Sequence, residues 1–187
     1  MVKKLALALS IALSIFLSVG ASQATAENIA GQSAHILYPN KPVVSSVPLM
    51  KKRLTIKRML LKYDSPLAGD VDTFINSCME YVLDCYLLPS ITGLESYFGR
   101  YTHPNSYNPF GWGGGYILFD TWGEAIQTVA SGLRQNYANR GAVSVEEIGP
   151  IYAESKTWAV RVNHFMDLFD KEEQKLDLFL NDHIVNL

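Results

Sequence analysis

The chain has 187 residues and a formal net charge of −2, with 16 basic and 18 acidic side chains. The charges are unevenly distributed, because residues 28–63 hold seven basic residues and no acid, whereas the net charge from residue 64 onward is −10. Such an acidic domain argues against nucleic acid as its partner. Two cysteines and four histidines match no metal-ligand spacing, so we expect no metal and no cofactor.

The first 26 residues have the organisation of a secretory signal peptide. Lys3 and Lys4 precede an apolar run from Leu5 to Val19, and Ala24-Thr25-Ala26 matches a small-x-small cleavage site. We therefore expect residues 1–26 to be cleaved and the protein to be exported. The alternative is an uncleaved anchor, for which the apolar run is short compared with the roughly 20 residues of a membrane span.

Residues 27–62 are predicted to form a basic, flexible tether. The part before residue 50 is rich in proline and serine and shows no sustained periodicity. Residues 50–62 carry apolar side chains among basic ones, so a short amphipathic helix is an alternative there. The basic residues of 41–62 could attract an anionic wall or membrane surface. The simpler interpretation is a solvated linker.

Apolar residues recur at helical spacing through residues 63–170, which predicts a mainly α-helical domain. The predicted helices cover residues 71–82, 84–99, 121–137 and 158–169, a short helix begins at Ser144, and a charged helical tail follows over 171–187. Capping boxes open two of these helices, at Thr121–Glu124 and at Ser144–Glu147. The second of the two is expected to be interrupted at Gly149-Pro150.

Residues 101–119 lack helical periodicity and contain four glycines, so we expect a small irregular or β-hairpin lobe there. Before this lobe stand the two cysteines, Cys78 and Cys85, in a chain whose export permits a disulfide. On one continuous helix they would lie about 10.5 Å apart, too far for a bond. A turn at Leu83-Asp84 would let them meet, and the sequence leaves both arrangements open.

A single carboxylate, Glu95, stands near the end of the mostly apolar segment from Leu87 to Gly99. Burial at the mouth of an apolar element raises the pKa of a carboxyl, which then keeps a proton to donate at neutral pH. The following segment, from Tyr101 to Tyr116, is rich in the aromatic and amide side chains that a sugar-binding groove needs. The combination indicates cleavage of a glycosidic bond with Glu95 as general acid.

Four short motifs follow one another along the domain. They are Leu88–Gly99, in which a Glu-Ser pair precedes an aromatic residue and glycine, Ser106–Gly111, Phe119–Trp122 with Ala125-Ile126, and Ile151–Ala153 with Trp158–Val162. Together they resemble the motifs of bacterial glucosaminidases of the lysozyme superfamily, over about residues 63–168. The resemblance implies a lysozyme-like helical domain that cleaves a β-1,4 glycosidic bond of the peptidoglycan glycan strand. The protein would then be a secreted or cell-wall-associated glycosidase.

The resemblance also implies roles for individual residues. Glu95 matches the general acid and Tyr152 the active-site tyrosine of the family, so both are predicted to be catalytic. Trp112 is a candidate for stacking on a sugar ring, although it could instead pack the lobe onto the helices. The residues predicted to bind substrate are Ser96, Tyr107, Asn108, Phe110, Trp112 and Asp120.

A second carboxylate is difficult to identify in the sequence. Between Glu95 and Glu124 the only acid is Asp120, which also suits the N-terminus of the next helix. We therefore favour chemistry with one carboxylate, in which the N-acetyl oxygen of the substrate attacks and Glu95 acts as acid and then as base. The alternatives are a lytic transglycosylase, a catalytically inactive wall-binding module, and an interaction protein that recruits a partner through its basic arm or acidic tail.

Overall fold

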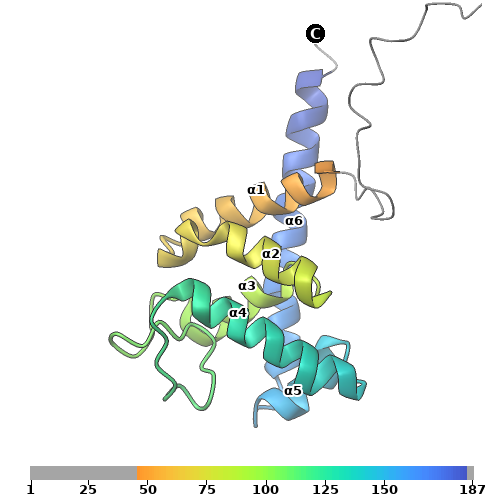
Figure 1. The fold of residues 1–187 in the computed structure, drawn as a ribbon. Helices are drawn as coiled ribbons and strands as arrows, with labels where there is room; N and C mark the ends of the chain where they lie inside the picture. Colours follow the sequence, from red (N-terminus) through yellow and green to blue (C-terminus); the bar gives the residue numbers. More distant parts are fainter. Residues whose placement is uncertain (1–45, 185–187) are drawn as a thin grey trace, which may run out of the picture. The chain divides into compact units, whose positions relative to one another are not determined.

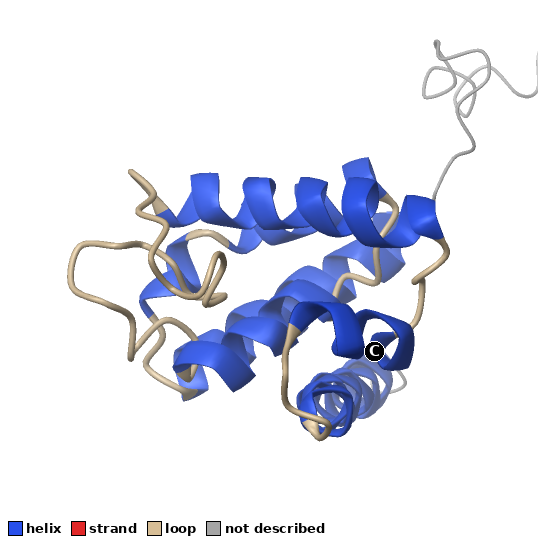
Figure 2. Cartoon of the chain, turned by 90° about the horizontal axis from the view of Figure 1, so that it is seen from below, coloured by secondary structure: helices blue, strands red, loops and turns tan. Residues whose placement is uncertain are grey.

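The computed structural model describes residues 46–184, and side chains from residue 47 to residue 180. The predicted signal peptide (1–26), residues 27–45 and the last three residues lie outside the described part. Residues 46–184 form helices joined by turns and one long loop, without a β-strand (Figures 1 and 2). The mainly α-helical class is confirmed, and the lobe takes the irregular form. No helix within the described range has the length and apolar character to cross a membrane.

The domain contains six α-helices and three shorter helical elements within the described range. The α-helices are α1 (Ser46–Lys62), α2 (Val71–Tyr81), α3 (Leu87–Ser96), α4 (Trp122–Gly132), α5 (Val145–Tyr152) and α6 (Trp158–Ile184). The shorter elements are the 3-10 helix η1 (Pro66–Gly69), the π-helical η2 (Leu133–Tyr137) and the 3-10 helix η3 (Ala138–Arg140). The π-helical η2 continues α4 directly to Tyr137, the predicted end, and η3 extends the helical segment to Arg140.

Helix α1 is part of the folded domain. Its residues Ile56, Met59 and Leu60 are at most 1% exposed and belong to the core, and the helix packs against α2 and α6. These residues recur every three or four positions and so form one apolar face. The prediction of a tether is therefore wrong for residues 46–62. The alternative of an amphipathic helix is correct, and the helix begins at Ser46.

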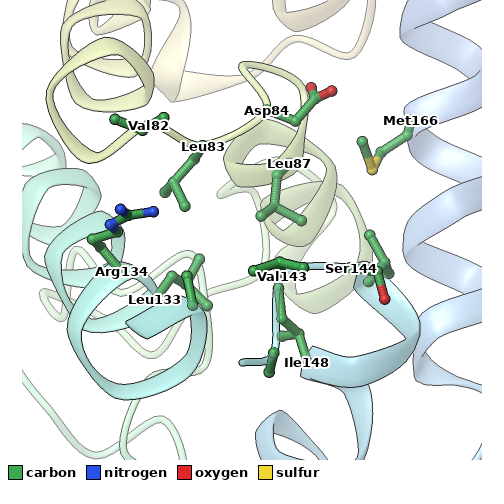
Figure 3. Close-up of a pocket in the computed structure, with 13 residues that line it drawn as sticks. Val82, Leu83, Asp84, Leu87, Leu133, Arg134, Val143, Ser144, Ile148 and Met166 are labelled. Atoms are coloured by element: carbon green, nitrogen blue, oxygen red, sulfur yellow. The ribbon is translucent and has the colours of Figure 1, made fainter. Parts of the chain in front are cut away.

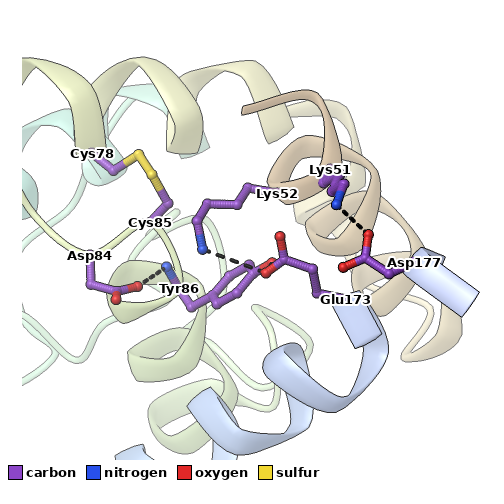
Figure 4. A network of polar contacts seen from close by, with 8 residues as sticks. All are labelled: Lys51, Lys52, Cys78, Asp84, Cys85, Tyr86, Glu173 and Asp177. Carbon is purple, nitrogen blue, oxygen red and sulfur yellow. Dashed lines mark hydrogen bonds and ion pairs between the residues drawn. A yellow bond between two sulfur atoms is a disulfide. The ribbon is translucent and has the colours of Figure 1, made fainter. Parts of the chain in front are cut away.

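Helix α6 continues without a break to Ile184, so the predicted helical tail is the second half of this helix as far as it is described. Its acidic side chains pair with basic side chains of α1, and Figure 4 shows the pairs made by Lys51 and Lys52. The pairs are Lys51 with Asp177, Lys52 with Glu173, and Arg58 with Glu172, and Arg53 pairs with Asp72 of α2. Four of the basic residues considered for an anionic surface thus have acidic partners inside the domain.

A disulfide joins Cys78 to Cys85 with a Cα–Cα distance of 4.9 Å. Helix α2 ends at Tyr81 and the chain turns back, so the arrangement with a turn is the correct one. The next residue, Tyr86, is 1% exposed and donates a hydrogen bond from its hydroxyl to Glu173 over 2.8 Å (Figure 4). Tyr86 thereby fixes the start of α3 against α6.

Helix α3 packs against α6 along most of its length and is almost completely buried. Gly93 permits this close packing, because a Cβ at this position would lie 2.8 Å from the ring of Phe165 and 2.9 Å from that of Phe98. Real Cβ atoms essentially never approach other atoms so closely. The glycine therefore brings the last turn of α3, which carries Glu95, beside the first turns of α6.

The two predicted capping boxes differ in the structure. At Ser144 both reciprocal hydrogen bonds with Glu147 are present, and the helix continues past Pro150 to Tyr152. The predicted interruption at Gly149-Pro150 is wrong. A proline removes only one backbone hydrogen bond, and the helix tolerates this loss because it ends two residues after Pro150. At Thr121 only half of the box forms, since the carboxylate of Glu124 accepts from the N–H of Asp120 instead.

Candidate active site

Glu95 lies on the last turn of α3, between the start of α6 and the glycine-rich loop. Its Oε1 accepts a hydrogen bond from Nε1 of Trp158 over 2.7 Å. On the loop side, a Cβ at Gly111 would lie 3.4 Å from Oε2 of Glu95. Gly111 has φ +62°, a backbone conformation that favours glycine, so this residue allows the loop to approach the carboxyl. The carboxyl is thus held between α6 and the loop.

Burial of the carboxyl raises the pKa of Glu95 above its ordinary value. Glu95 as a whole keeps exposed surface, so the effect comes from the local loss of water around the carboxyl. The hydrogen bond from Trp158 and the positive charge of Arg161 act in the opposite direction, because both favour the carboxylate. Desolvation therefore outweighs these contacts, and the raised pKa is the property that a proton donor needs.

Tyr152 lies at the end of α5, with its ring stacked on Trp158 at a centroid distance of 4.7 Å. Its hydroxyl donates a hydrogen bond to the carbonyl oxygen of Phe110 over 2.8 Å. Burial and the nearby charge of Glu95 raise the pKa of Tyr152 well above its ordinary value, so the phenol stays neutral. Tyr152 joins α5 to the loop and supports Trp158, and its hydroxyl is bonded to Phe110 rather than to Glu95.

Three residues predicted to bind substrate are buried, two of them in the loop and the third, Ser96, at the end of α3. Asn108 donates to the carbonyls of Trp112 and Ile117 and accepts from the N–H of Trp112. The hydroxyl of Ser96 donates to the carbonyl of Pro109 over 2.7 Å. Phe110 is fully buried, and Ser96 and Asn108 are each 4% exposed. The contacts of Asn108 and Phe110 lie within the loop, whereas Ser96 also lines the open pocket that contains Glu95, so substrate binding by these residues stays a prediction.

The other predicted binding residues differ in their surroundings. Trp112 is half-buried, and its indole packs over Gly132 of α4, so it fastens the loop to the helices. Tyr107 is 39% exposed and lies edge-on to Trp122, with ring centroids 5.0 Å apart. Asp120 is exposed and stands directly before the capping residue of α4.

One open pocket is lined by Glu95, and a second is lined by Gly111, the glycine nearest Oε2 of Glu95. The first, which we call the Arg161 pocket, has a volume of about 350 Å³ and is lined by Glu95 itself and by residues of α3, α6 and the adjacent loop, including Tyr97, Tyr101, Arg161 and Phe165. The second, the Trp112 pocket, has a volume of about 360 Å³ and is lined by Gly111, Trp112, Gly113, Gly114, Tyr137 and Tyr152. Asp120 lines neither pocket.

Sequence reasoning missed two residues of this site. Trp158 is a core residue at 2% exposure, and its N–H also donates a hydrogen bond to Glu95. A buried tryptophan needs a partner for its N–H, which was the available signal. Arg161 follows three positions later and so lies on the same face of α6. No signal in the sequence placed this face opposite Glu95.

A further pocket, of about 270 Å³, lies at the other end of α3 (Figure 3). Leu87, which lines it, stands eight residues before Glu95, or about 12 Å along the helix axis. Its walls are mainly aliphatic, and the carboxylate of Asp84 points away from its centre while accepting a hydrogen bond from the N–H of Tyr86. This pocket offers no proton donor comparable with Glu95.

Within the described side chains, no group of three or more His, Cys, Asp or Glu residues is arranged to hold a metal ion. We also compared the chain with protein-family models and with curated proteins, and neither comparison gave a match.

Proposed function

We propose that the protein is a secreted peptidoglycan hydrolase that cleaves a β-1,4 glycosidic bond of the glycan strand, with Glu95 as general acid. The observation that carries this proposal is the carboxyl of raised pKa, fixed between Trp158 and Gly111 and lining an open pocket. The mainly helical domain with one irregular, glycine-rich lobe supports the further proposal of a lysozyme-like fold.

The hydrogen bond from Trp158 determines which oxygen carries the proton. Because Oε1 accepts from Nε1 of Trp158, the proton of the neutral acid belongs on Oε2, the oxygen nearest Gly111. Glu95 donates this proton to the leaving glycosidic oxygen while positive charge develops at the anomeric carbon. A neutral Tyr152 keeps Trp158 and the turn at Phe110 in place.

Chemistry with a single carboxylate accounts best for this site. A second carboxylate would have to lie about 5–5.5 Å from the acid as a nucleophile, or about 6.5–9.5 Å away as a base. The charged group that acts on Glu95 is the cationic Arg161, and Asp120, the only acid between Glu95 and Glu124 in sequence, lines neither pocket. The N-acetyl oxygen of the substrate then attacks the anomeric carbon, and Glu95 activates the water that completes hydrolysis.

Two alternative functions would use the same site around Glu95. A lytic transglycosylase would use the same acid and form an internal anhydro ring instead of admitting water. A catalytically inactive wall-binding module would retain the pockets without turnover.

Digestion of purified peptidoglycan tests the proposal. The protein and its Glu95→Gln variant are compared, and the released fragments are reduced with borohydride and identified by mass spectrometry. Reduced N-acetylglucosamine ends that disappear in the variant establish a glucosaminidase, reduced muramic ends a muramidase, and anhydro ends a transglycosylase. If neither protein releases fragments but both sediment with the wall, the hydrolase proposal fails and the binding module is correct.

A further inference from the structure

The guanidinium of Arg161 has no hydrogen-bond partner among the described residues of the proposed site. Arg161 is exposed on α6 and lines the same pocket as Glu95. Among the described residues its guanidinium makes no hydrogen bond and no ion pair, although it is close enough to Glu95 to lower the pKa of that carboxyl. A guanidinium has five N–H donors and a planar geometry that matches a carboxylate. These donors are available to a ligand.

An aromatic wall stands in the same pocket. The rings of Tyr97 and Tyr101 lie 5.9 Å apart at an interplanar angle of 33°, and the two residues are 40% and 71% exposed. Arg100 supports both rings, with its guanidinium 5.6 Å from the centroid of Tyr97 and 6.0 Å from that of Tyr101. Unlike Arg161, Arg100 also donates a hydrogen bond, to the carbonyl of Tyr63. The wall is therefore a pre-arranged surface on which an apolar sugar face can stack.

We propose that the Arg161 pocket is a subsite for a sugar that carries a carboxylate. The sugar ring stacks on Tyr97 and Tyr101, and its carboxylate pairs with Arg161. This inference rests on the proposed function and makes Arg161 the residue that discriminates strands with N-acetylmuramic acid from neutral polymers of N-acetylglucosamine. The carboxylate has two possible sources, which are the lactyl group of a strand without stem peptides and the stem peptide itself.

The geometry favours a carboxylate over a neutral ligand. A charged hydrogen bond between guanidinium and carboxylate is about twice as strong as a neutral one, and it can be bidentate. The pocket is open, so water screens this pair and the gain is moderate. Arg161 should therefore determine preference among glycans more than it determines overall affinity.

Binding measurements separate this role from catalysis. In the Glu95→Gln protein, affinities are measured for three glycans of equal length, namely a neutral N-acetylglucosamine oligomer, a peptide-free muramyl strand and a strand with stem peptides. Arg161→Gln should weaken binding of a carboxylate-bearing strand about tenfold and change binding of the neutral oligomer less than twofold. Arg161→Lys should give an intermediate loss, because it keeps the charge without the planar fork. Arg140→Gln, at an exposed arginine that lines neither pocket, is the control for net charge.

The outcomes distinguish the two sources and the two proposals. A loss on peptide-free strands identifies the lactyl carboxylate, and a loss confined to peptide-bearing strands identifies the stem peptide. An equal loss on all three glycans, or no loss on any, overturns the subsite. If the Glu95→Gln protein binds muramyl strands through Arg161 but the original protein cleaves nothing, the subsite stands and the hydrolase proposal fails. If cleavage occurs and Arg161→Gln does not alter the preference among the three glycans, the subsite fails and the hydrolase proposal stands. Circular dichroism checks that each variant is folded.

Discussion

Nε1 of Trp158, at the start of α6, donates a hydrogen bond to Oε1 of Glu95, at the end of α3, over 2.7 Å. Trp158 also stacks on Tyr152 at the end of α5. This one indole therefore sets the position of the proposed acid relative to two other helices, and it assigns the proton to the oxygen that faces Gly111.

Replacing Trp158 with Phe removes the donor and keeps an aromatic ring. Because the hydrogen bond favours the carboxylate, its loss should raise the pKa of Glu95 further. The alkaline limb of the pH profile of kcat/KM reports loss of the acid's proton, so it should move to higher pH, while the maximal rate falls severalfold as the carboxyl loses its orientation. Trp122→Phe is the matched control. An alkaline limb that stays in place in Trp158→Phe would contradict the role of this bond.

Glu95 should lower the stability of the domain at neutral pH. Its pKa is higher in the folded state, so the folded protein binds the proton more tightly than the unfolded chain. Stability therefore falls as the pH rises from the ordinary value of 4.5 through the raised folded value, and it is highest below this window. At pH 7 Glu95→Gln should be more stable by up to about 1 kcal/mol, since solvent screens part of the effect. Below the window the two proteins should be equally stable.

Denaturant unfolding at pH 4 and pH 7 measures this difference, and Glu146→Gln provides a control of opposite sign. The pKa of Glu146 is lowered by a backbone hydrogen bond and by Asn163, whose Nδ2 donates to Oε1 over 2.6 Å. The carboxylate of Glu146 therefore stabilises the folded state at neutral pH, and this contribution is lost as the pH falls and the carboxylate is protonated. Glu146→Gln should therefore destabilise the protein at pH 7. Equal stability of Glu95→Gln and the original protein at pH 7 would show that the carboxyl is not desolvated.

Gly111→Ala should reduce activity much more than Gly115→Ala. Both glycines have positive φ, +62° and +82°, so each alanine should cost about 1 kcal/mol of stability through backbone strain. Only at Gly111 would the new Cβ lie 3.4 Å from Oε2 of Glu95, whereas a Cβ at Gly115 would meet nothing within 4 Å. At matched stability, the rate of glycan cleavage should fall at least tenfold in Gly111→Ala but not in Gly115→Ala. Equal rates in both would mean that the loop does not restrict access to the acid.

The hydroxyl of Tyr152 should matter for the loop rather than for proton transfer. Tyr152→Phe removes its hydrogen bond to Phe110 and keeps the stack on Trp158, so we expect a stability loss of about 1 kcal/mol. The pH profile should keep its shape, with a reduced maximum. Tyr137→Phe is the control, since Tyr137 lines the same pocket and its hydroxyl makes no hydrogen bond to the described residues. A large shift of the pH profile in Tyr152→Phe would instead indicate a direct role in proton transfer.

Helical periodicity predicted most of the fold because the core is built from apolar faces, as Trp158 and Val162 illustrate. The raised pKa of Glu95 was predictable for a related reason, since its neighbours on α3 are apolar. The loop-internal role of Asn108 could not be predicted, because a polar loop residue has the same appearance in sequence whether it faces a ligand or the loop interior. Helix α1 was obscured by basic residues whose acidic partners on α6 lie more than 100 positions later.

The disulfide should stabilise the domain without taking part in the proposed reaction. Its sequence separation is 7, and closure of so short a loop removes unfolded-state entropy equivalent to about 2.4 kcal/mol. A Cys78→Ser/Cys85→Ser protein should lose about this much, and its melting temperature should no longer respond to reductant. Cys85 precedes α3 and Glu95 lies on its last turn, so glycan cleavage well below the melting temperature should persist. Loss of cleavage on reduction without loss of stability would instead link the turn before Tyr86 to the position of Glu95, because α3 connects the two.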